Sequence, residues 1–240
     1  MSLHGTRKNP SVGADETKTT TKTTMLQGGR AKDALRAVAC VNTPSRIVMA
    51  MTFAVLTACS STPSTRFYVL SAMAGAEATP VSTKPVSVVI RDIRLPQYLE
   101  RPQLVTRDGE NRIQLADDAQ WAGNLQQDMV RVLTENLGLL LTSDRVFSAP
   151  HNGPLKPDFK VDVEILRFEQ GADRRVTLSA RWWLIRGSDN ALIEAPSVSL
   201  NSAPIDKLSR DSLVAAMSAV YGELAQLIAR SVKAKEAATK

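Results

Sequence analysis

The sequence predicts an α+β domain over residues 66–236, with a mainly antiparallel sheet and two long helices packed on one face. Several short runs alternate apolar and polar residues, as half-buried strands do, and two longer runs repeat apolar residues at three- and four-residue steps. The helical runs do not alternate one for one with the strands, as they would in a parallel α/β fold. One face of an antiparallel sheet can stay in contact with water.

The first strands are indicated at 66–70 and 86–93, where side chains alternate in character and Pro96 ends the second run. Two further runs, 103–107 and 112–115, flank an Asp-Gly-Glu-Asn turn. Because Asp-Gly between β-forming runs is a strong hairpin signal, we expect these two runs to pair as a hairpin.

A helix is predicted from about Asp118 to Leu137. Asp117 can cap its N-terminus, with Gln120 completing a capping box, and Gly138 provides a C-terminal stop. One apolar stripe follows the helical repeat, so the tryptophan at its start is expected in the core. The stripe consists of Trp121, Leu125, Met129, Val132 and Leu140.

The clearest β signal comes from two alternating runs, 158–168 and 175–186, around a Gln-Gly-Ala-Asp turn. We predict that they form a hairpin with one apolar face, because a slip of one residue would turn every apolar side chain out to solvent. The predicted core pairs are Phe159 with Leu184, Val161 with Trp182, Val163 with Ala180 and Ile165 with Leu178.

The other face of this hairpin carries polar side chains and one tryptophan. The same register sets Asp162 opposite Arg181 as an ion pair and Lys160 opposite Trp183 as a cation–π contact. Trp183 has two interpretations. Either Lys160 and a neighbouring loop cover it, or it contacts a protein or lipid partner, since an aromatic residue on a wet face is typical of an interface.

Residues 191–200 predict a further strand, broken at Pro196. A long helix is expected from about 207 to 233, because apolar residues recur at near-heptad spacing along one stripe. Six such positions are too few for a coiled coil, so we expect the helix to pack against the sheet. The stripe is formed by Leu213, Met217, Val220, Leu224, Leu227 and Ile228.

Charge is distributed unevenly along the chain. Residues 1–58 contain 8 Lys and Arg against 3 Asp and Glu, whereas residues 59–240 contain 22 against 21. The folded part is therefore close to neutral and lacks the concentrated basic face that nucleic-acid binding requires. The polar, Thr-rich residues 1–45 have little with which to form a core and are expected to be disordered.

An export signal and a lipid anchor are indicated next. Arg46 precedes 12 uncharged, mainly apolar residues, 47–58, which are too few to span a membrane but match the core of a secretory signal. The run ends in Leu-Thr-Ala-Cys59, which resembles a bacterial lipobox. We predict removal of residues 1–58, acylation of Cys59 (palmitate among its lipids) and a flexible tether over 59–65. The alternative is a chance small-small-Cys sequence that ends a buried helix.

Residues able to perform chemistry are few. His151 is the only histidine beyond the leader and lies in a Pro-His-Asn-Gly-Pro turn, while helix capping explains the pair Asp117-Asp118. The sequence contains no dinucleotide, P-loop, nucleophile-elbow or zinc-protease motif. We therefore expect no catalytic residues, no metal, no cofactor apart from the lipid on Cys59, and no enzyme. An envelope enzyme with a polar pocket around His151 is the minor alternative.

Residues 95–107 carry the most specific pattern in the chain. The run Tyr98-Leu99-Glu100-Arg101-Pro102-Gln103-Leu104-Val105-Thr106-Arg107 closely resembles the signature of ABC-transport auxiliary lipoproteins of the PqiC/YmbA type. Further motifs of that family continue in order as far as residue 232. Gly123-Asn124 departs from the pattern, in which Glu-Pro is expected.

The resemblance implies a periplasmic subunit, anchored in the outer membrane, of a system that moves lipid between the two membranes and maintains the envelope. Its implied partners are a mammalian-cell-entry (MCE) protein and inner-membrane transporter components. In lipoproteins of this kind, Ser60 after the acylated cysteine implies sorting to the outer membrane. Because MCE tunnels are rings, a matching homo-oligomeric ring is expected. The alternative function is a lipid carrier with an apolar pocket between its helices and its sheet.

Four residues are candidates for partner binding: Tyr98, Arg101, Arg107 and Trp183. Pro102 favours an extended backbone at Arg101 and a rigid entry into the strand at Gln103. Both arginines offer planar guanidinium donors to a partner carboxylate or a lipid phosphate. The alternative is structural, with both arginines paired to Asp108, Glu110 or backbone carbonyls.

Overall fold

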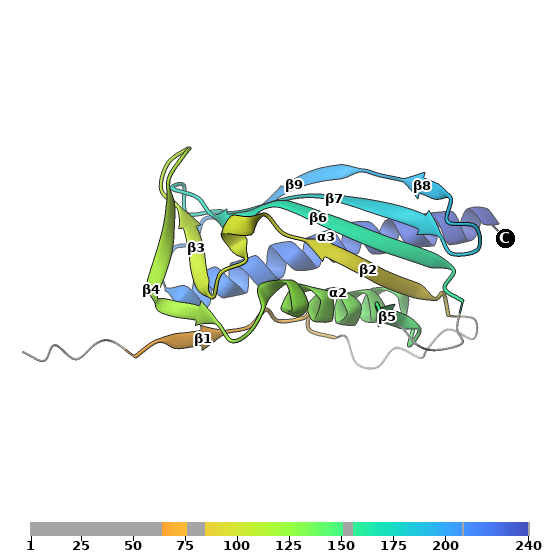
Figure 1. The fold of residues 1–240 in the computed structure, drawn as a ribbon, viewed down its shortest axis with the longest axis horizontal. Helices are drawn as coiled ribbons and strands as arrows, with labels where there is room; N and C mark the ends of the chain where they lie inside the picture. Colours follow the sequence, from red (N-terminus) through yellow and green to blue (C-terminus); the bar gives the residue numbers. More distant parts are fainter. Residues whose placement is uncertain (1–63, 76–84, 151–155, 208, 240) are drawn as a thin grey trace, which may run out of the picture. The chain divides into compact units, whose positions relative to one another are not determined.

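The computed structural model describes residues 64–75, 85–150, 156–207 and 209–239, all within the unit Ser61–Lys240 (Figure 1). The predicted leader 1–58, the predicted acylation site Cys59 and His151 lie outside the described residues. Of the predicted tether 59–65, only Ser64 and Thr65 are described.

Nine strands form a single mixed sheet. They are β1 (Arg66–Tyr68), β2 (Val88–Arg94), β3 (Gln103–Arg107), β4 (Ile113–Trp121), β5 (Val146–Ser148), β6 (Phe159–Gln170), β7 (Val176–Arg186), β8 (Leu192–Glu194) and β9 (Ser197–Asn201). The order is β1-β4-β3-β6-β2-β5, with β7 pairing β6, β8 and β9. Among these described strands, the pairs β1–β4, β2–β5, β2–β6 and β3–β6 are parallel and the other four are antiparallel. The predicted α+β class is confirmed; the sheet is mixed, and its longest ladder, between β6 and β7, is antiparallel.

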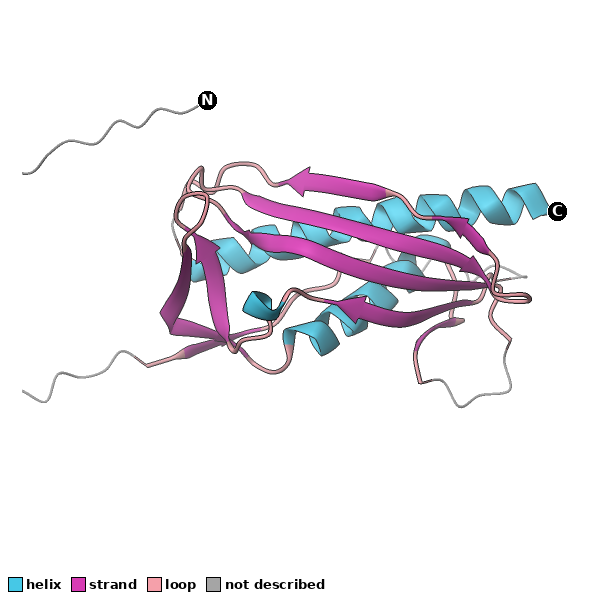
Figure 2. Cartoon of the chain, turned by 45° about the horizontal axis from the view of Figure 1, so that its top comes forward, coloured by secondary structure: helices cyan, strands magenta, loops and turns pink. Residues whose placement is uncertain are grey.

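Two helices, α2 (Leu125–Leu141) and α3 (Arg210–Thr239), pack along one face of the sheet, as predicted (Figure 2). α2 contacts β2 and β5, α3 contacts β6, β7 and β9, and the helices contact each other. The fully buried Tyr221 of α3 packs against Phe168 of β6 and donates its hydroxyl to the backbone carbonyl of Met129 in α2 at 2.9 Å. One side chain thus links both helices to the sheet.

α3 is the one described helix that is long and apolar enough to cross a membrane, judged by length and hydropathy alone. Within its most apolar window, however, 61% of the helix is buried inside the domain. The apolar stripe therefore serves the core, as predicted for 207–233, and the helix continues to Thr239. Its buried residues include Leu213, Met217, Val220, Leu224 and Ile228.

The predicted helix start at Asp118 is wrong. This residue lies in β4, which pairs with β3 and β1, and α2 begins only at Leu125. Asn124 caps α2, because its side-chain oxygen accepts a hydrogen bond from the Gln127 N–H at 3.0 Å. A single cap contributes about 1 kcal/mol, whereas two strand ladders provide partners for the backbone groups of the segment. Strand pairing therefore outweighs the capping signal at Asp117.

The predicted helix stop at Gly138 is also wrong. α2 continues to Leu141 and ends at Thr142, which adopts the left-handed conformation with φ of 51°. The Ser143 N–H bonds to the Gly138 carbonyl at 3.0 Å, so a threonine in this conformation closes the helix without a glycine. Trp121 is buried in the core as predicted, but as the last residue of β4 rather than in a helix.

The predicted pairing of the long hairpin is displaced by two residues, so that Val163 lies opposite Trp182 rather than Ala180. A displacement by two keeps the side chains of β6 as far as Ile165 on their predicted face, so the apolar face is confirmed and the predicted partners are wrong. The cause is the connection: β6 and β7 are joined by the five residues 171–175, and a bulge follows Ile165. The observed pairs are Phe159 with Arg186, Val161 with Leu184, Val163 with Trp182 and Ile165 with Ala180.

The other strands follow the predictions closely. The runs at 66–70 and 86–93 contain β1 and most of β2, and β3 and β4 form the predicted hairpin. The predicted strand over 191–200 is two strands, β8 and β9, on either side of Pro196, and both pair with β7. The short strand β5 was not predicted.

The segment after β1, residues 69–73, crosses both helices and is called the strap below. The Leu70 N–H donates to Asp128 Oδ2 of α2 at 2.6 Å, and Arg131 Nη2 donates back to the Leu70 carbonyl at 2.8 Å. The Ser71 N–H donates to Ser218 Oγ of α3 at 3.1 Å. Side chains of the helices thus take the place of a neighbouring strand for this part of the backbone.

Candidate partner-binding site

Within the segment 95–107, the short loop 100–102 is held on both sides by buried leucines. A short 3-10 helix, η1 (Gln97–Leu99), follows Pro96 and buries Leu99, while Leu104 is buried one residue into β3. Between these anchors, residues 100–102 are exposed. The sequence pattern therefore produces a short exposed loop fixed on both sides by the core.

A buried carboxylate lies beneath this segment. Phe168 of β6 points into the core, so its neighbour Glu169 points to the opposite, outer face of the sheet, where its side chain is nevertheless 0% exposed. Tyr98 donates its hydroxyl to Glu169 Oε2 at 2.8 Å, and Arg107 Nε donates to Oε1 at 2.7 Å. Arg167 Nε also donates to Oε1, at 2.9 Å, and the Phe168 N–H donates to Oε2 at 3.0 Å. We call Tyr98, Arg107, Arg167 and Glu169 the Glu169 cluster.

Two members of this cluster, Tyr98 and Arg107, have shifted pKa values. Burial, followed by its contact with the Glu169 carboxylate, raises the pKa of Tyr98 to about 12. The hydrogen bond to Glu169 raises the pKa of Arg107 further above its ordinary value. Tyr98 therefore stays a neutral donor and Arg107 a permanent cation at physiological pH.

Of the two arginines in the signature, Arg107 is occupied within the domain. Besides Glu169, it donates through Nη1 to the Glu110 carbonyl at 2.8 Å, and its guanidinium carbon lies 5.9 Å from the centre of the Tyr98 ring. This matches the structural alternative for Arg107, with the Glu110 carbonyl as an expected partner and the Glu169 carboxylate as an additional one. The binding of a partner by Tyr98 and Arg107 stays a prediction.

Arg101 is different. It lies in the exposed loop, and no described residue forms a hydrogen bond or ion pair with its side chain. Its guanidinium is therefore available to an external group. Pro102 after it disfavours a helical backbone, which limits the directions in which the side chain can project.

Trp183 lies elsewhere on the outer face. It is half-buried, and its cation–π partner is Arg94, 5.2 Å from the ring centre, so the predicted pairing with Lys160 is wrong. Lys160 lies opposite Ile185 and donates to Asn190 Oδ1 at 2.6 Å.

Neighbouring charges on this face also differ from the prediction. Trp183 lies opposite Asp162, which pairs with Arg91, while Arg181 lies opposite Glu164. The predicted Asp162–Arg181 pair is therefore wrong, because of the two-residue displacement. Thr177, opposite Glu169, is six residues from Trp183 along β7, or about 20 Å. The structure thus brings Tyr98 and Arg107 together, but not Trp183.

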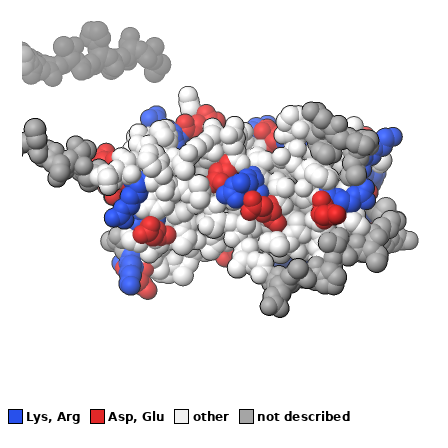
Figure 3. All heavy atoms as spheres, turned by 90° about the horizontal axis from the view of Figure 1, so that it is seen from below, with Lys and Arg blue, Asp and Glu red and all other residues white. Residues whose placement is uncertain are grey.

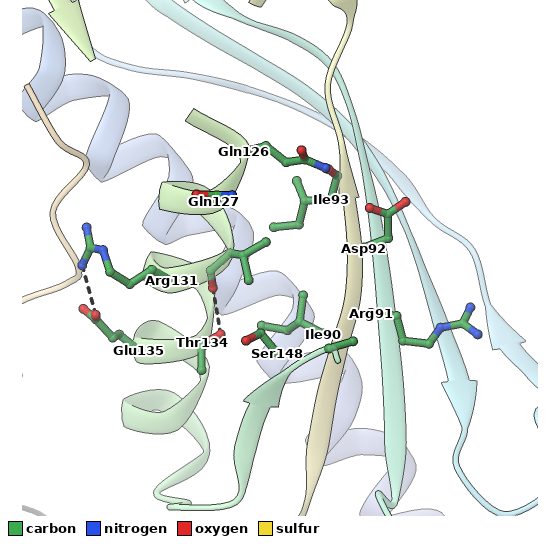
Figure 4. A pocket seen from close by; sticks show the side chains of 12 residues that line it. Ile90, Arg91, Asp92, Ile93, Gln126, Gln127, Arg131, Thr134, Glu135 and Ser148 are labelled. Atoms are coloured by element: carbon green, nitrogen blue, oxygen red, sulfur yellow. Dashed lines mark hydrogen bonds and ion pairs between the residues drawn. The ribbon is translucent and has the colours of Figure 1, made fainter. Parts of the chain in front are cut away.

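Two clefts are relevant to ligand binding. One of about 590 Å³ lies between β2 and α2, where Ile90 and Ile93 point toward the helix and Asp92 points away (Figure 4). At this cleft, Gln126 Nε2 of α2 donates to the Ile93 carbonyl of β2 at 2.7 Å and so provides a partner for the backbone of that strand. None of the four predicted residues lines this cleft. A second cleft, of about 400 Å³, borders the Glu169 cluster at Arg107.

In the described ranges, no three His, Cys, Asp or Glu side chains lie close enough together to hold a metal ion. The residue of the candidate site that sequence reasoning missed is Glu169. It occupies an outward position in an alternating strand, where a solvated glutamate is the ordinary expectation. The signal that was available is the presence of Tyr98 and Arg107, two donors of the signature that need an acceptor when buried.

This segment, with its fold, corresponds to a known family. The family described as ABC-type transport auxiliary lipoprotein component matches residues 68–229. The chain belongs to this family. The resemblance identified from residues 95–107 is therefore confirmed, and the protein is a lipoprotein component associated with ABC-type transport.

Solved structures agree on the fold. A crystal structure of an uncharacterized protein is 21% identical, covers 70% of this chain and 99% of that chain, and has a TM-score of 0.58. The crystal structure of protein XCC0632 from Xanthomonas campestris is 12% identical, covers 73% of this chain and 99% of that chain, and has a TM-score of 0.59. At these identities the likeness concerns the fold alone. A comparison with curated proteins finds no match.

Proposed function

We propose that the protein is an outer-membrane-anchored periplasmic subunit of an MCE-type lipid-transport system, and that it docks the periplasmic tunnel protein and supports envelope integrity. Membership of a transport auxiliary lipoprotein family supports the class of function. The lipobox-like Leu-Thr-Ala-Cys59 supports acylation, and Ser60 supports sorting to the outer membrane. A homo-oligomeric ring matching the MCE ring is part of this proposal.

The observation that carries the docking role is the preorganised loop 100–102. The Glu169 cluster fixes Tyr98 before the loop and Arg107 after it, while Leu99 and Leu104 are buried. Fixing a loop before binding removes ordering entropy from the cost of association. Such a loop presents the unpaired guanidinium of Arg101 in a set place, where it fits a carboxylate on a protein partner.

The alternative, a lipid carrier with its own apolar pocket, receives no specific support from the described residues. Core side chains fill the space between the helices and the sheet, and Tyr221, Leu224 and Ile228 of α3 are fully buried there. The cleft of about 590 Å³ lies beside this core, between the end of β2 and α2, and mixed polar and apolar residues line it.

The anchor is tested by metabolic palmitate labelling and membrane fractionation. Wild type is expected to take up label and to sediment with the outer membrane, whereas Cys59→Ser loses both properties. Cys40→Ser removes the only other cysteine and is the matched control, expected to behave as wild type. Equal labelling of the Cys59→Ser protein would contradict the anchor.

Docking is tested by binding of the purified MCE-domain protein to two charge-reversal variants. Arg101→Glu is expected to weaken binding about 30-fold or more, because a close interfacial charge pair is lost and a repulsion replaces it. Arg230→Glu is the matched control, since Arg230 is also exposed and is far from the loop in sequence. An Arg101→Glu protein that binds as tightly as the control would contradict docking by this loop.

A further inference from the structure

Two apolar side chains next to the predicted tether are more than half exposed to solvent. Phe67 and Val69 are 65% and 52% exposed, and they are the only two of the large exposed apolar side chains in the described residues that share one strand and its extension. Isolated exposed apolar residues are ordinary, whereas two on the same side of an edge strand and its extension are candidates for an interaction surface. The question is therefore what covers this pair, called the β1 patch below.

The backbone holds the β1 patch outward. Phe67 pairs with Gln120 of β4 in parallel register, and the Ala122 N–H bonds to the Tyr68 carbonyl at 2.8 Å. Leu70 is buried, and side chains of α2 bind both its backbone N–H and its backbone carbonyl. Side chains alternate between the two faces of an extended chain. Because Leu70 points into the core, Val69 and Phe67 point away from it. Rotation of the strand to hide them would break these bonds.

The position of the patch in the sequence indicates its partner. Phe67 follows Cys59 by eight residues, so a fully extended chain separates them by about 28 Å at most. The only charged residue from Cys59 to Val69 is Arg66, which is exposed, and no acidic residue lies in between. A tether of this length holds the patch at a high effective concentration near any bilayer that contains the acyl chains.

The surrounding surface favours apolar contact over a purely electrostatic one. The face on which β1 and α2 lie shows separate charged groups among wide uncharged areas, without a continuous basic region (Figure 3). A phenylalanine with a neighbouring aliphatic residue and an arginine suits the boundary between acyl chains and phosphates.

We infer that Phe67 and Val69 are a second membrane contact, which inserts into the interface of the bilayer that holds the acylated Cys59, with Arg66 at the level of the lipid phosphates. This contact sets the orientation of the domain against the membrane, which a flexible tether alone leaves free. The inference rests on the proposed acylation of Cys59.

The test uses the acylated mature chain, which begins at Cys59, in vesicles of phosphatidylethanolamine and phosphatidylglycerol, with and without brominated acyl chains. Phe67→Trp places a fluorophore in the β1 patch. Leu192→Trp is the matched control, because Leu192 is 60% exposed and lies in β8, at the other end of the sheet from β1 (Figure 1). After subtraction of the wild-type signal, emission from the Phe67→Trp protein is expected to shift to the blue and to be quenched at least twofold more strongly than that of the control.

Each other outcome overturns the inference. Equal quenching in the two variants, with acylated Cys59 confirmed by mass spectrometry, would remove the membrane contact and leave the anchor intact. A blue shift that follows protein concentration in the absence of vesicles would assign the patch to a second copy of the chain. Lack of acylation at Cys59 would overturn both the anchor and the contact. Because both substituted sites are exposed, circular dichroism of the two variants should match wild type.

Discussion

Two arginine–carboxylate groups on the outer face of the sheet have the same chemistry and different surroundings. Glu169 is 0% exposed and Arg107 is 21% exposed, whereas Asp162 and Arg91 are 19% and 41% exposed. Around Asp162, water competes with the ion pair and screens it. Around Glu169, the overlying segment 95–107 excludes water, so the protein must supply every hydrogen-bond partner of the carboxylate.

The difference teaches where rigidity arises in this molecule. The Asp162 group can open at little cost because water replaces either partner. The Glu169 cluster cannot, because loss of one donor leaves a charge without a partner in a dry site. The order of the exposed loop at Arg101 therefore depends on the carboxylate of Glu169, which is itself buried.

The largest expected effect is that of Glu169→Ala. Removal of a buried carboxylate shared by two arginines is expected to lower the free energy of unfolding by about 3–5 kcal/mol. Urea titration followed by circular dichroism measures it. A loss below about 1 kcal/mol would show that the Glu169 cluster behaves like a surface ion pair, and the contrast between the two groups would fail.

A smaller effect is expected for Tyr98→Phe, which keeps the ring under Arg107 and removes one donor to the carboxylate. A hydrogen bond to a charged group contributes about 1.5–3 kcal/mol, so a loss in this range is expected in the same titration. Exposure of residues 97–103 to amide hydrogen exchange should rise in parallel. If the hydrogen exchange of these residues did not change, the Glu169 cluster would not be what orders the loop.

The same variant sharpens the comparison through pH. The folded-state pKa of Tyr98 is raised to about 12, above its ordinary value of 10.0, so its contribution is complete below pH 10 and is lost as the pH rises toward 12. Wild type should therefore lose stability over this alkaline range more steeply than Tyr98→Phe. The pKa of the buried Tyr221 is also raised, so Tyr221 contributes to the loss of stability with rising pH in both proteins. Identical slopes would contradict the role of Tyr98.

The smallest effect is expected for Asp162→Asn. Its ion pair with Arg91 is partly exposed, so the loss should be about 0–1 kcal/mol and should shrink further as salt is added. Measurement at low and high salt checks both statements. A loss as large as that of Glu169→Ala would show that burial does not separate the two groups.

The sequence predicted those features that depend on local pattern. The alternation in 158–186 identified both strands of the long hairpin and their apolar face, and the repeat in 207–233 identified α3. Features set by distant contacts were missed. Residues 117–121 carry a good local helix-start signal, yet β1 and β3 hold them as part of a strand.

The candidate site shows the same limit. Arg101 was identified from the signature and lies exposed, as a docking residue requires. Glu169 was missed because its burial depends on Tyr98 and Arg107, which precede it by 71 and 62 residues. The two-residue displacement of the long hairpin depends on a bulge and a five-residue turn, which alternation alone does not encode.

The strap determines the order in which the molecule can be completed. Residues 69–73 are among the first of the domain to be synthesised, yet the hydrogen bond from Ser71 reaches Ser218, 147 residues downstream. The entropy of closing so long a loop must be overcome before this bond forms. A nascent domain that lacks α3 can pair β1 with β4 and bind Leu70 to α2, but it lacks the hydrogen bond from Ser71 to Ser218. The last helix to be made thus supplies the final attachment of the strap.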